Sequence, residues 1–369
     1  MNIHLILQMA ADSMPDREAV ICGCQRLTYQ DLSYAVNSLA DKLEGTQKLA
    51  YLAETGTAAP VAMFAAALRG IPYVPINYRL AEDQITSLLK RVSPALLISD
   101  DAPEVEGITK ISPVQVFSPD TSWDGFAPDE EGNIAIELFT SGTTGDPKSA
   151  ILRHDNLMAY ILGTIEFMSA EESQSTLVSV PPYHIAGISA ILSSVYAGRR
   201  MVQLPNFSPE AWLKLAKQEN VSQAFLVPTM LQRIIEYTAS NNETLDLPAM
   251  QAIAYGGGKM PHSVIEQAMT LMPHVNFTNA YGLTETSSTI CLLDPDDHRD
   301  AVQSNDPAVR ARLSSVGRTL PAVEVEIRDD YNAPCGAGDA GYVFVRGEQV
   351  SGEYHGSGSL LDENGWFPT

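Results

Sequence analysis

Short apolar runs alternate with helix-like segments along the first two-thirds of the chain. In the stretch LTYQDLSYAVNSLADKL, Leu32, Ala35 and Leu39 recur at three- or four-residue intervals, which predicts a helix with one apolar face. The apolar runs between such segments predict strands. The predicted helices are 3–10, 27–43, 58–68, 81–91, 155–168, 185–196, 210–219, 228–237 and 263–271, and the predicted strands are 19–22, 26–29, 48–53, 73–75, 95–98, 134–139, 176–180, 201–204, 223–227, 251–254 and 275–279.

The pattern of apolar and polar residues changes at two places along the chain. Strands that alternate with helices pair in parallel and carry the helices on the sheet faces, so the pattern predicts a doubly wound α/β fold. Residues 101–132 are rich in Asp, Glu, Pro and Ser and predict a solvated connection. After Ser314, apolar and charged residues alternate, which predicts short antiparallel strands in a small, distorted β-barrel. We therefore expect α/β units at 1–132 and 133–313, and a barrel-like unit at 314–369.

The chain is strongly acidic, and this excludes some partners. Lys and Arg number 23 against 45 Asp and Glu, which gives a net charge of −22. Such a surface repels nucleic-acid phosphates and anionic lipid heads, so we expect no nucleic-acid partner. No run of 18 apolar residues occurs, so we expect no membrane span. An anionic ligand must be held by local groups.

The cysteines and the amino terminus indicate a cytoplasmic protein. Four cysteines in 369 residues are too few for a disulfide framework. Cys22 and Cys24 have no second pair nearby, so we interpret them as small hydrophobic residues, not zinc ligands. The first residues carry no basic segment and reach Asp12 and Asp16 early, unlike a secretory signal.

A loop suited to phosphates is the strongest chemical pattern. In LFTSGTTGDPKSA, an apolar strand leads into small and hydroxyl residues closed by Lys148, with a helix expected soon after. Small residues let backbone N–H groups point inward around an anion, and the lysine supplies countercharge. Pro147 precedes the lysine, so the string is not a Walker A loop, and the alternative of a flexible linker is poorly supported. The predicted phosphate-binding residues are Thr140, Ser141, Gly142, Thr143, Thr144, Gly145 and Lys148.

Four strings in family order resemble the adenylate-forming enzymes, which include acyl-CoA and aryl-CoA ligases, luciferases and peptide-synthetase adenylation domains. Residues 140–148 match their T-S-G-T-T-G-x-P-K pattern, although Ser149 replaces the usual glycine. NAYGLTET matches Y-G-x-T-E, and SVGRTLPAVEVEI is similar to V-G-x-P-x-P-x-V with Thr319 in place of proline. The fourth string, GYVFVRGEQVSGEYHGSG followed by DENGWFPT, is similar to the family segment that normally continues into Gly-Asp. Together the four strings cover residues 138–369.

The resemblance implies how these residues handle ATP and Mg²⁺. The loop and Lys148 would hold the β- and γ-phosphates, and Thr284 would bind the α-phosphate. Glu285 would help to hold Mg²⁺, a cation that prefers oxygen ligands. Without the surrounding YGLTET, an exposed acidic residue after a turn would be the better interpretation of Glu285.

A second group of residues would hold the adenine. The resemblance places the base against Gly256, Gly257 and Gly258 on one side and Tyr281, followed by Gly282, on the other. A planar base needs close backbone and an aromatic face. The glycine run is also compatible with a simple turn from strand to helix.

His184, in VPPYHIAG, lies where the family has a residue near the carboxylate of the acid substrate. The string that amino-acid-activating domains carry here is absent, which favours an acyl or aryl acid without an α-amine. A histidine that merely starts a helix is the alternative. Ile185, Ile188 and Ile191 either line an acyl pocket or form an ordinary core face.

The expected activity is ATP-dependent conversion of a carboxylic acid to acyl-AMP, followed by transfer to the thiol of CoA. An acyl-carrier protein or an amine as acceptor is one alternative, and a non-catalytic acyl-AMP-binding module is another; the latter predicts eroded motifs, whereas Lys148, Thr284 and Glu285 are all present. The chain stops at GWFPT inside a patterned segment. We therefore expect a large N-terminal domain that lacks the hinge and small C-terminal domain, where most of the CoA site would lie, and that turns over slowly.

Overall fold

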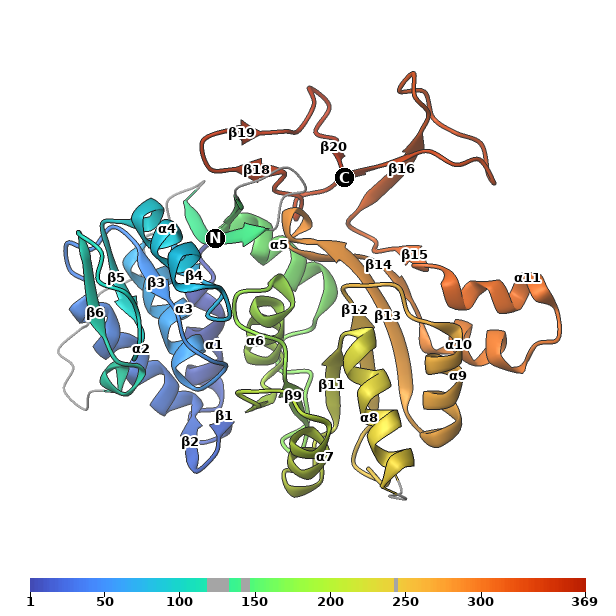
Figure 1. Ribbon diagram of the computed structural model, residues 1–369, viewed down its shortest axis with the longest axis horizontal. Helices are drawn as coiled ribbons and strands as arrows, with labels where there is room; N and C mark the ends of the chain where they lie inside the picture. Colours follow the sequence, from blue (N-terminus) through green and yellow to red (C-terminus); the bar gives the residue numbers. More distant parts are fainter. Residues whose placement is uncertain (118–132, 141–146, 242–244) are drawn as a thin grey trace.

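The structure is a computed structural model that describes residues 1–117, 133–140, 147–241 and 245–369 (Figure 1). Two large sheets run side by side with helices between them, and the red C-terminal segments cross one end of both sheets (Figure 1). Among the described residues, none of the helices combines the length and the apolar composition needed to cross a bilayer.

The larger sheet has nine strands within the described residues, in the order β15-β14-β13-β12-β11-β9-β10-β1-β2. The strands from β13 to β1 are parallel, and antiparallel neighbours lie at both edges. Its strands are β1 (Glu18–Cys22), β2 (Gln25–Thr28), β9 (Ser175–Val178), β10 (Arg200–Gln203), β11 (Gln223–Leu226), β12 (Ala252–Gly256), β13 (Asn276–Leu283), β14 (Ser288–Leu293) and β15 (Arg318–Thr319).

The second sheet has eight strands within the described residues, in the order β19-β18-β8-β7-β4-β3-β5-β6. The strands from β7 to β6 are parallel, whereas β8, β18 and β19 add on antiparallel. Its strands are β3 (Leu49–Tyr51), β4 (Tyr73–Pro75), β5 (Ala95–Ile98), β6 (Ile108–Ile111), β7 (Ile134–Thr140), β8 (Lys148–Arg153), β18 (Glu353–Tyr354) and β19 (Gly358–Ser359).

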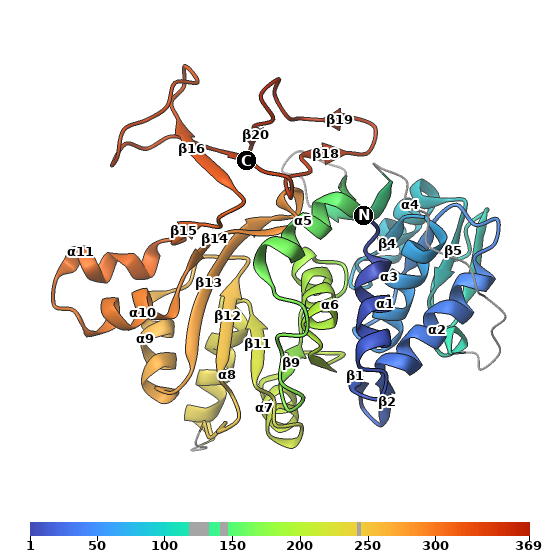
Figure 2. The same ribbon diagram turned by 180° about the vertical axis from the view of Figure 1, so that it is seen from behind.

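Helices fill the space between the sheets and cover their outer faces. The middle layer joins helices to residues of both sheets, such as Ile98 from one and Met201 from the other. Its helices are α1 (His4–Ser13), α2 (Tyr29–Lys42), α3 (Ala58–Arg69), α5 (His154–Thr164) and α6 (Ile185–Ala197). Seen from behind, α1 and α3 lie next to each other (Figure 2). The outer helices are α4 (Glu82–Val92) on the eight-stranded sheet and α7 (Pro209–Gln218), α8 (Pro228–Ser240) and α9 (His262–Leu271) on the nine-stranded sheet.

Period-two alternation of side chains makes this layering possible. Met201 points into the middle layer, whereas the next residue, Val202, packs on the outer face with α7 and α8. Tyr73 and Val74 divide in the same way in the other sheet. Because both faces of these strands are covered, they appear in the sequence as continuous apolar runs, as parallel strands usually do.

The segments after Ser314 tie the two sheets together. Three of their strands form a separate antiparallel sheet, namely β16 (Glu324–Arg328), β17 (Tyr342–Arg346) and β20 (Phe367–Pro368). By contrast, β15 pairs with the nine-stranded sheet, and β18 pairs with β8 of the eight-stranded sheet. The predicted antiparallel character is therefore confirmed for this region.

The predicted α/β class is confirmed, with local corrections. Within the predicted solvated connection 101–132, the structure has strand β6 and the short helix η1 (Pro113–Val116), because ITKI extends the sheet beside β5. The helix predicted to 168 ends at Thr164, and the helices α10 (Pro295–Gln303), α11 (Pro307–Arg310) and η3 (Ala311–Ser314) were not predicted.

The boundaries of the three predicted units stay a prediction, but neither large sheet is confined to one unit. Strands β1 and β2 precede residue 132 and belong to the nine-stranded sheet. Strands β7 and β8 follow residue 133 and belong to the eight-stranded sheet.

Candidate functional site

The turn that carries Glu285 meets the C-terminal strand β18. Thr284 and Glu285 lie in the short helix η2 (Thr284–Thr286), directly after β13. The hydroxyl of Tyr354, in β18, donates a hydrogen bond to the Glu285 carboxylate. The Lys148 ammonium, at the start of β8, lies 5.3 Å from the centre of the Tyr354 ring. Two predicted residues thus approach Tyr354, which was not predicted: Lys148 lies over its ring and Glu285 accepts from its hydroxyl.

This polar contact changes the acid–base chemistry of Tyr354. Burial and the neighbouring Glu285 carboxylate both raise the pKa of the Tyr354 phenol, so the hydroxyl stays protonated and acts as a donor. Lys148 can be attracted to the electron-rich face of the same ring. The three side chains together form a charged, hydrogen-bonded group at the ends of β8, β13 and β18.

Backbone contacts from the C-terminal region hold the Glu285 turn in place. The amides of Ser351 and Gly352 donate to the Glu285 carbonyl at 2.9 and 3.1 Å. The Gln349 amide donates to the carbonyls of Thr286 and Thr289 at 3.0 and 2.8 Å. A short turn fixed from outside in this way presents its carboxylate in a defined direction.

The predicted phosphate loop is described only at its ends. Ser141, Gly142, Thr143, Thr144 and Gly145 lie outside the described residues. Thr140, the last residue of β7, pairs with Lys148, the first residue of β8, and its hydroxyl donates to the Lys148 carbonyl at 3.4 Å. Arg91 donates to the Pro147 carbonyl at 2.7 Å. The helix expected soon after Lys148 begins at His154, one residue before its predicted start, and strand β8, which was not predicted, precedes it.

The predicted adenine residues line one cavity of about 410 Å³. Its walls include Gly256, Gly257, Gly258, Tyr281 and Gly282, together with Met260, Asn279 and Leu313. Close backbone contact explains two of these glycines. A Cβ atom at Gly256 would lie 2.2 Å from the Ala280 carbonyl oxygen, and one at Gly282 would lie 1.8 Å from that of Ser288. Close packing therefore requires glycine at position 256, and all three glycines of the run line the cavity.

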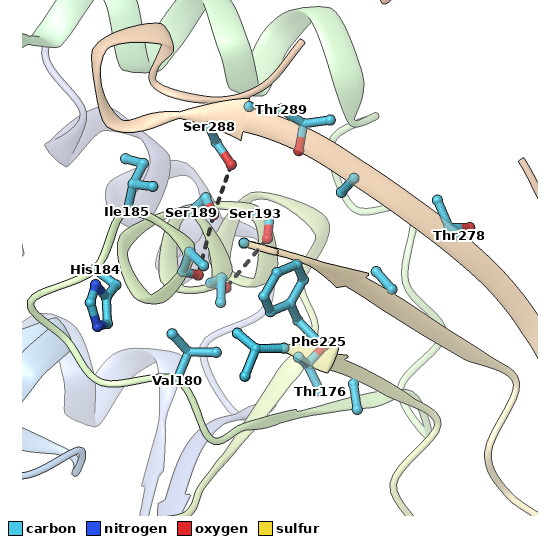
Figure 3. A pocket seen from close by; sticks show the side chains of 18 of the residues that line it. Thr176, Val180, His184, Ile185, Ser189, Ser193, Phe225, Thr278, Ser288 and Thr289 are labelled. Carbon is cyan, nitrogen blue, oxygen red and sulfur yellow. Dashed lines mark hydrogen bonds between the residues drawn. The ribbon is translucent and has the colours of Figure 1, made fainter. Parts of the chain in front are cut away.

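A second cavity, of about 540 Å³, lies between α6 and the nine-stranded sheet (Figure 3). Gly257, Ala280 and Gly282 line both this cavity and the glycine-walled one, so the two spaces are adjacent. Thr284 also lines the larger cavity. The predicted α-phosphate residue therefore lies on the larger cavity, two residues after Gly282, which both cavities share.

His184 is on the wall of the larger cavity, at the start of α6 (Figure 3). Its ring centre lies 4.6 Å from that of Tyr183. Desolvation lowers the pKa of His184, and the positive charge of Arg79 lowers it further. The imidazole is therefore neutral at pH 7 and can donate one hydrogen bond. Of the three isoleucines considered, Ile185 lines the cavity, whereas Ile188 and Ile191 pack in the core.

Hydroxyl side chains interrupt the otherwise mainly apolar wall of the larger cavity. Ser189 and Ser193 are four residues apart and therefore share one face of α6. Ser288 donates to the Ser189 hydroxyl at 3.3 Å, and Ser193 donates to the Ala190 carbonyl at 3.3 Å (Figure 3). The remaining hydroxyl side chains on the wall are Tyr160, Thr176, Thr278, Thr284 and Thr289. Apart from Thr284, sequence patterns did not predict these residues, because each lies on an ordinary helix or strand.

Comparisons with known proteins show the family and the fold of the chain. The family described as AMP-binding enzyme matches residues 7–355. A 2-succinylbenzoate–CoA ligase of Bacillus cereus is 26% identical over 98% of this chain and 74% of its own length. ScoC of Streptomyces coeruleorubidus, a ligase of fatty acids and acyl-carrier protein, is 26% identical over 84% of this chain and 65% of its length. The O-succinylbenzoate coenzyme A synthetase of Bacillus subtilis, solved with AMP, superposes with a TM-score of 0.83 at 25% identity, covering 99% of this chain and 93% of that one.

Proposed function

The chain belongs to the family of AMP-binding enzymes, and from this premise we propose how its residues activate a carboxylic acid. It is an AMP-forming acid–thiol ligase. The residue assignments rest on one observation: the two cavities share the wall residues Gly257, Ala280 and Gly282, and Thr284 lines the larger cavity nearby. An acyl-adenylate is a molecule with a base at one end, an acyl group at the other and a phosphate between them.

The first half-reaction joins two anions. A carboxylate oxygen of the acid attacks the α-phosphorus of ATP, the bond from that phosphorus to the bridging oxygen breaks, and pyrophosphate leaves with the electron pair. Catalysis therefore depends on positioning and on neutralising charge. We assign the β- and γ-phosphates to Lys148 and the loop from Thr140 to Gly145, and the α-phosphate to Thr284.

The residues present are suited to a magnesium ion. Within the part of the chain that the structure describes, no three His, Cys, Asp or Glu side chains gather into a metal cluster. Mg²⁺ in nucleotide sites commonly takes one or two carboxylates together with phosphate oxygens and waters, so one carboxylate is sufficient. Glu285 would supply it, held by the hydrogen bond from Tyr354. When bound, the ion neutralises charge on the phosphates.

The acid and the base occupy the two cavities in this proposal. Tyr281 and the glycines at 256–258 hold the adenine in the smaller cavity. His184, neutral at pH 7, donates a hydrogen bond to the carboxylate that reacts. The acyl group extends along α6 into the larger cavity.

The second half-reaction passes the acyl group to a thiol. We propose CoA as the thiol, in the cytoplasm, where the four cysteines, free in the structure, would stay reduced. The name of ScoC makes an acyl-carrier protein the second candidate acceptor. The expectation of slow turnover by this chain stays a prediction.

Two ligands separate the roles of the site residues in a thermal unfolding assay. One is ATP with Mg²⁺, and the other is a stable sulfamoyl mimic of an acyl-adenylate, which lacks β- and γ-phosphates. A ligand at a hundred times its dissociation constant adds about 2.7 kcal/mol, which raises the midpoint of a chain of this size by about 3 °C. Lys148→Ala and Glu285→Gln should lose the shift with ATP and keep the shift with the mimic.

Lys90→Ala is the matched control, because Lys90 is an exposed lysine on α4. It should keep both shifts. The assignments would be overturned if Lys148→Ala and Glu285→Gln kept the ATP shift, or if neither ligand shifted the wild-type chain.

A further inference from the structure

The far end of the larger cavity carries an arginine. Arg199 lines the cavity, and among the described lining residues it is the one with a permanent positive charge. None of these lining residues is Asp or Glu.

The turn after α6 directs Arg199 toward the cavity side of the sheet. Gly198 ends the helix with a left-handed conformation, φ 72°, and Arg200 then begins β10. The backbone is held by the Arg199 amide, which donates to the Ser194 carbonyl at 2.8 Å, and by the Tyr29 hydroxyl, which donates to the Arg199 carbonyl at 3.1 Å.

The neighbouring arginine shows what an ordinary structural role looks like. Arg200 donates from Nη1 to the Glu18 carboxylate at 3.1 Å and from Nη2 to the Glu219 carbonyl at 2.6 Å. Its Nη1 also lies 3.8 Å from the Glu219 carboxylate. Arg200 thus has two carboxylates around it.

Arg199 has no such partners. Within the described residues its side chain forms neither a hydrogen bond nor an ion pair, and its Nε is buried. Burial lowers the pKa of the Arg199 guanidinium. Holding a partly buried charge without a counter-charge costs stability, so a chain that retains one here gains something other than stability.

The length of the cavity along α6 and the residues on its wall indicate which kind of acyl group fits between its two ends. His184 and Ile185 are at the first turn of α6, and Ser193 is eight residues after Ile185, which corresponds to about 12 Å along the helix. Arg199 follows the end of the same helix. The wall between them is mainly apolar, with the hydroxyls of Ser189 and Ser193 on one face of α6, which suits an acyl group that has an apolar body and a polar end.

We propose that the substrate is a dicarboxylic acid, with one carboxylate activated near His184 and Thr284 and the other paired with Arg199. This inference rests on the proposed function. The distal carboxylate does not react, and its role is recognition. A guanidinium and a carboxylate form a charge-assisted pair, frequently with two parallel hydrogen bonds, and this pair replaces the counter-charge that the protein lacks.

Two acyl-sulfamoyl adenosine mimics of equal length test the inference by calorimetric titration. One ends in a carboxylate and the other in the neutral carboxamide. The wild-type chain should bind the carboxylate about 10- to 100-fold more tightly, which corresponds to about 1.4–2.8 kcal/mol. Arg199→Met should remove this preference and change the affinity for the carboxamide by less than about threefold. The reason is that the charge-assisted hydrogen bonds of the Arg199 guanidinium form with the carboxylate and not with the neutral carboxamide.

The thermal stability of the unliganded chain distinguishes a structural role of Arg199 from a role in substrate recognition. Arg199→Met should leave the midpoint of thermal unfolding unchanged or raise it, because it removes an unpaired charge. Arg200→Met, the matched control, should lower the midpoint and keep the preference for the carboxylate. Arg199→Lys keeps the charge and should retain part of the preference.

The outcomes separate this inference from the function on which it rests. Equal wild-type affinity for the two mimics overturns the dicarboxylic acid and leaves the adenylate site standing. Binding of neither mimic, although ATP with Mg²⁺ binds, contradicts the acid cavity itself. A lower unfolding midpoint for both Arg199→Met and Arg199→Lys, with the carboxylate preference intact, makes Arg199 structural.

Discussion

The layer between the two sheets is solid in one half and hollow in the other. In the solid half, helix α3 is apolar nearly all round, and Phe64 and its neighbours are buried between the eight-stranded sheet and helices α1 and α2. In the hollow half, helix α6 packs only one side into the core, through Ile188, Ile191 and Val195. Its other side, with Ser189 and Ser193, borders the larger cavity.

The two helices teach how a fold keeps space for a ligand. Both are built from small and apolar residues, but α3 interrupts its alanines with large side chains such as Phe64, whereas α6 places alanine and serine where a large side chain would close the gap. Protein interiors normally pack as densely as organic crystals. An open space therefore has to be maintained by the choice of small residues around it.

Removing bulk from the solid half should have the largest effect. Phe64→Ala leaves a cavity in the layer and should lower the free energy of unfolding by about 3–5 kcal/mol, measured by urea titration. The acyl-adenylate mimic should bind the folded variant with unchanged affinity, because Phe64 does not line either of the ligand cavities. A loss of affinity greater than tenfold would mean that the two halves of the layer are mechanically coupled.

The second-largest effect should be a loss of unfolding free energy at low pH, through a histidine in the solid half. Burial lowers the pKa of His4, in α1, from 6.5 to about 4. Because the unfolded chain takes up this proton at a higher pH than the folded chain, stability is full above pH 6.5 and falls as the pH drops toward 4. The loss reaches about 3 kcal/mol at the lower limit. His4→Phe should flatten the plot of unfolding free energy against pH between 6.5 and 4, and an unchanged slope would contradict the role of His4.

The smallest effects should come from larger side chains, which should destabilise the solid half more than the hollow half. Ala62 is fully buried in α3, and Ala190 lines the cavity from α6. Ala62→Leu should cost about 1–3 kcal/mol of unfolding free energy through overpacking. Ala190→Leu enters open space, so it should change stability by less than about 1 kcal/mol and weaken binding of the mimic. Equal destabilisation by the two substitutions in urea titrations would show that the cavity is closed in solution.

The regular part of the fold was predictable from local patterns. Helices such as α3 and strands such as β5 follow directly from apolar spacing and run length. The errors arose where a stronger local pattern competed. Strand β8 directly follows the glycine- and threonine-rich loop, and β6 lies within an acidic, proline-containing stretch, so neither stood out.

The candidate site was predictable only where its functional residues belong to a short motif of consecutive residues. Lys148 and Glu285 belong to short motifs, and the structure places them together with Tyr354. Tyr354 comes from a strand 69 residues after Glu285, and no local pattern reports such an approach. Arg199 resembles an ordinary charged residue at a helix end, and its meaning depends on the absence of a partner among the described residues.

The central claim is that the acid lies along α6 with its far end at Arg199. The most direct measurement is a crystal structure of the chain with the sulfamoyl mimic of an adenylated dicarboxylic acid. The account predicts the adenine between Tyr281 and the glycines at 256–258, and the distal carboxylate within hydrogen-bonding distance of the Arg199 guanidinium. An acyl group outside the larger cavity, or a distal carboxylate in solvent with Arg199 still unpaired, would contradict it.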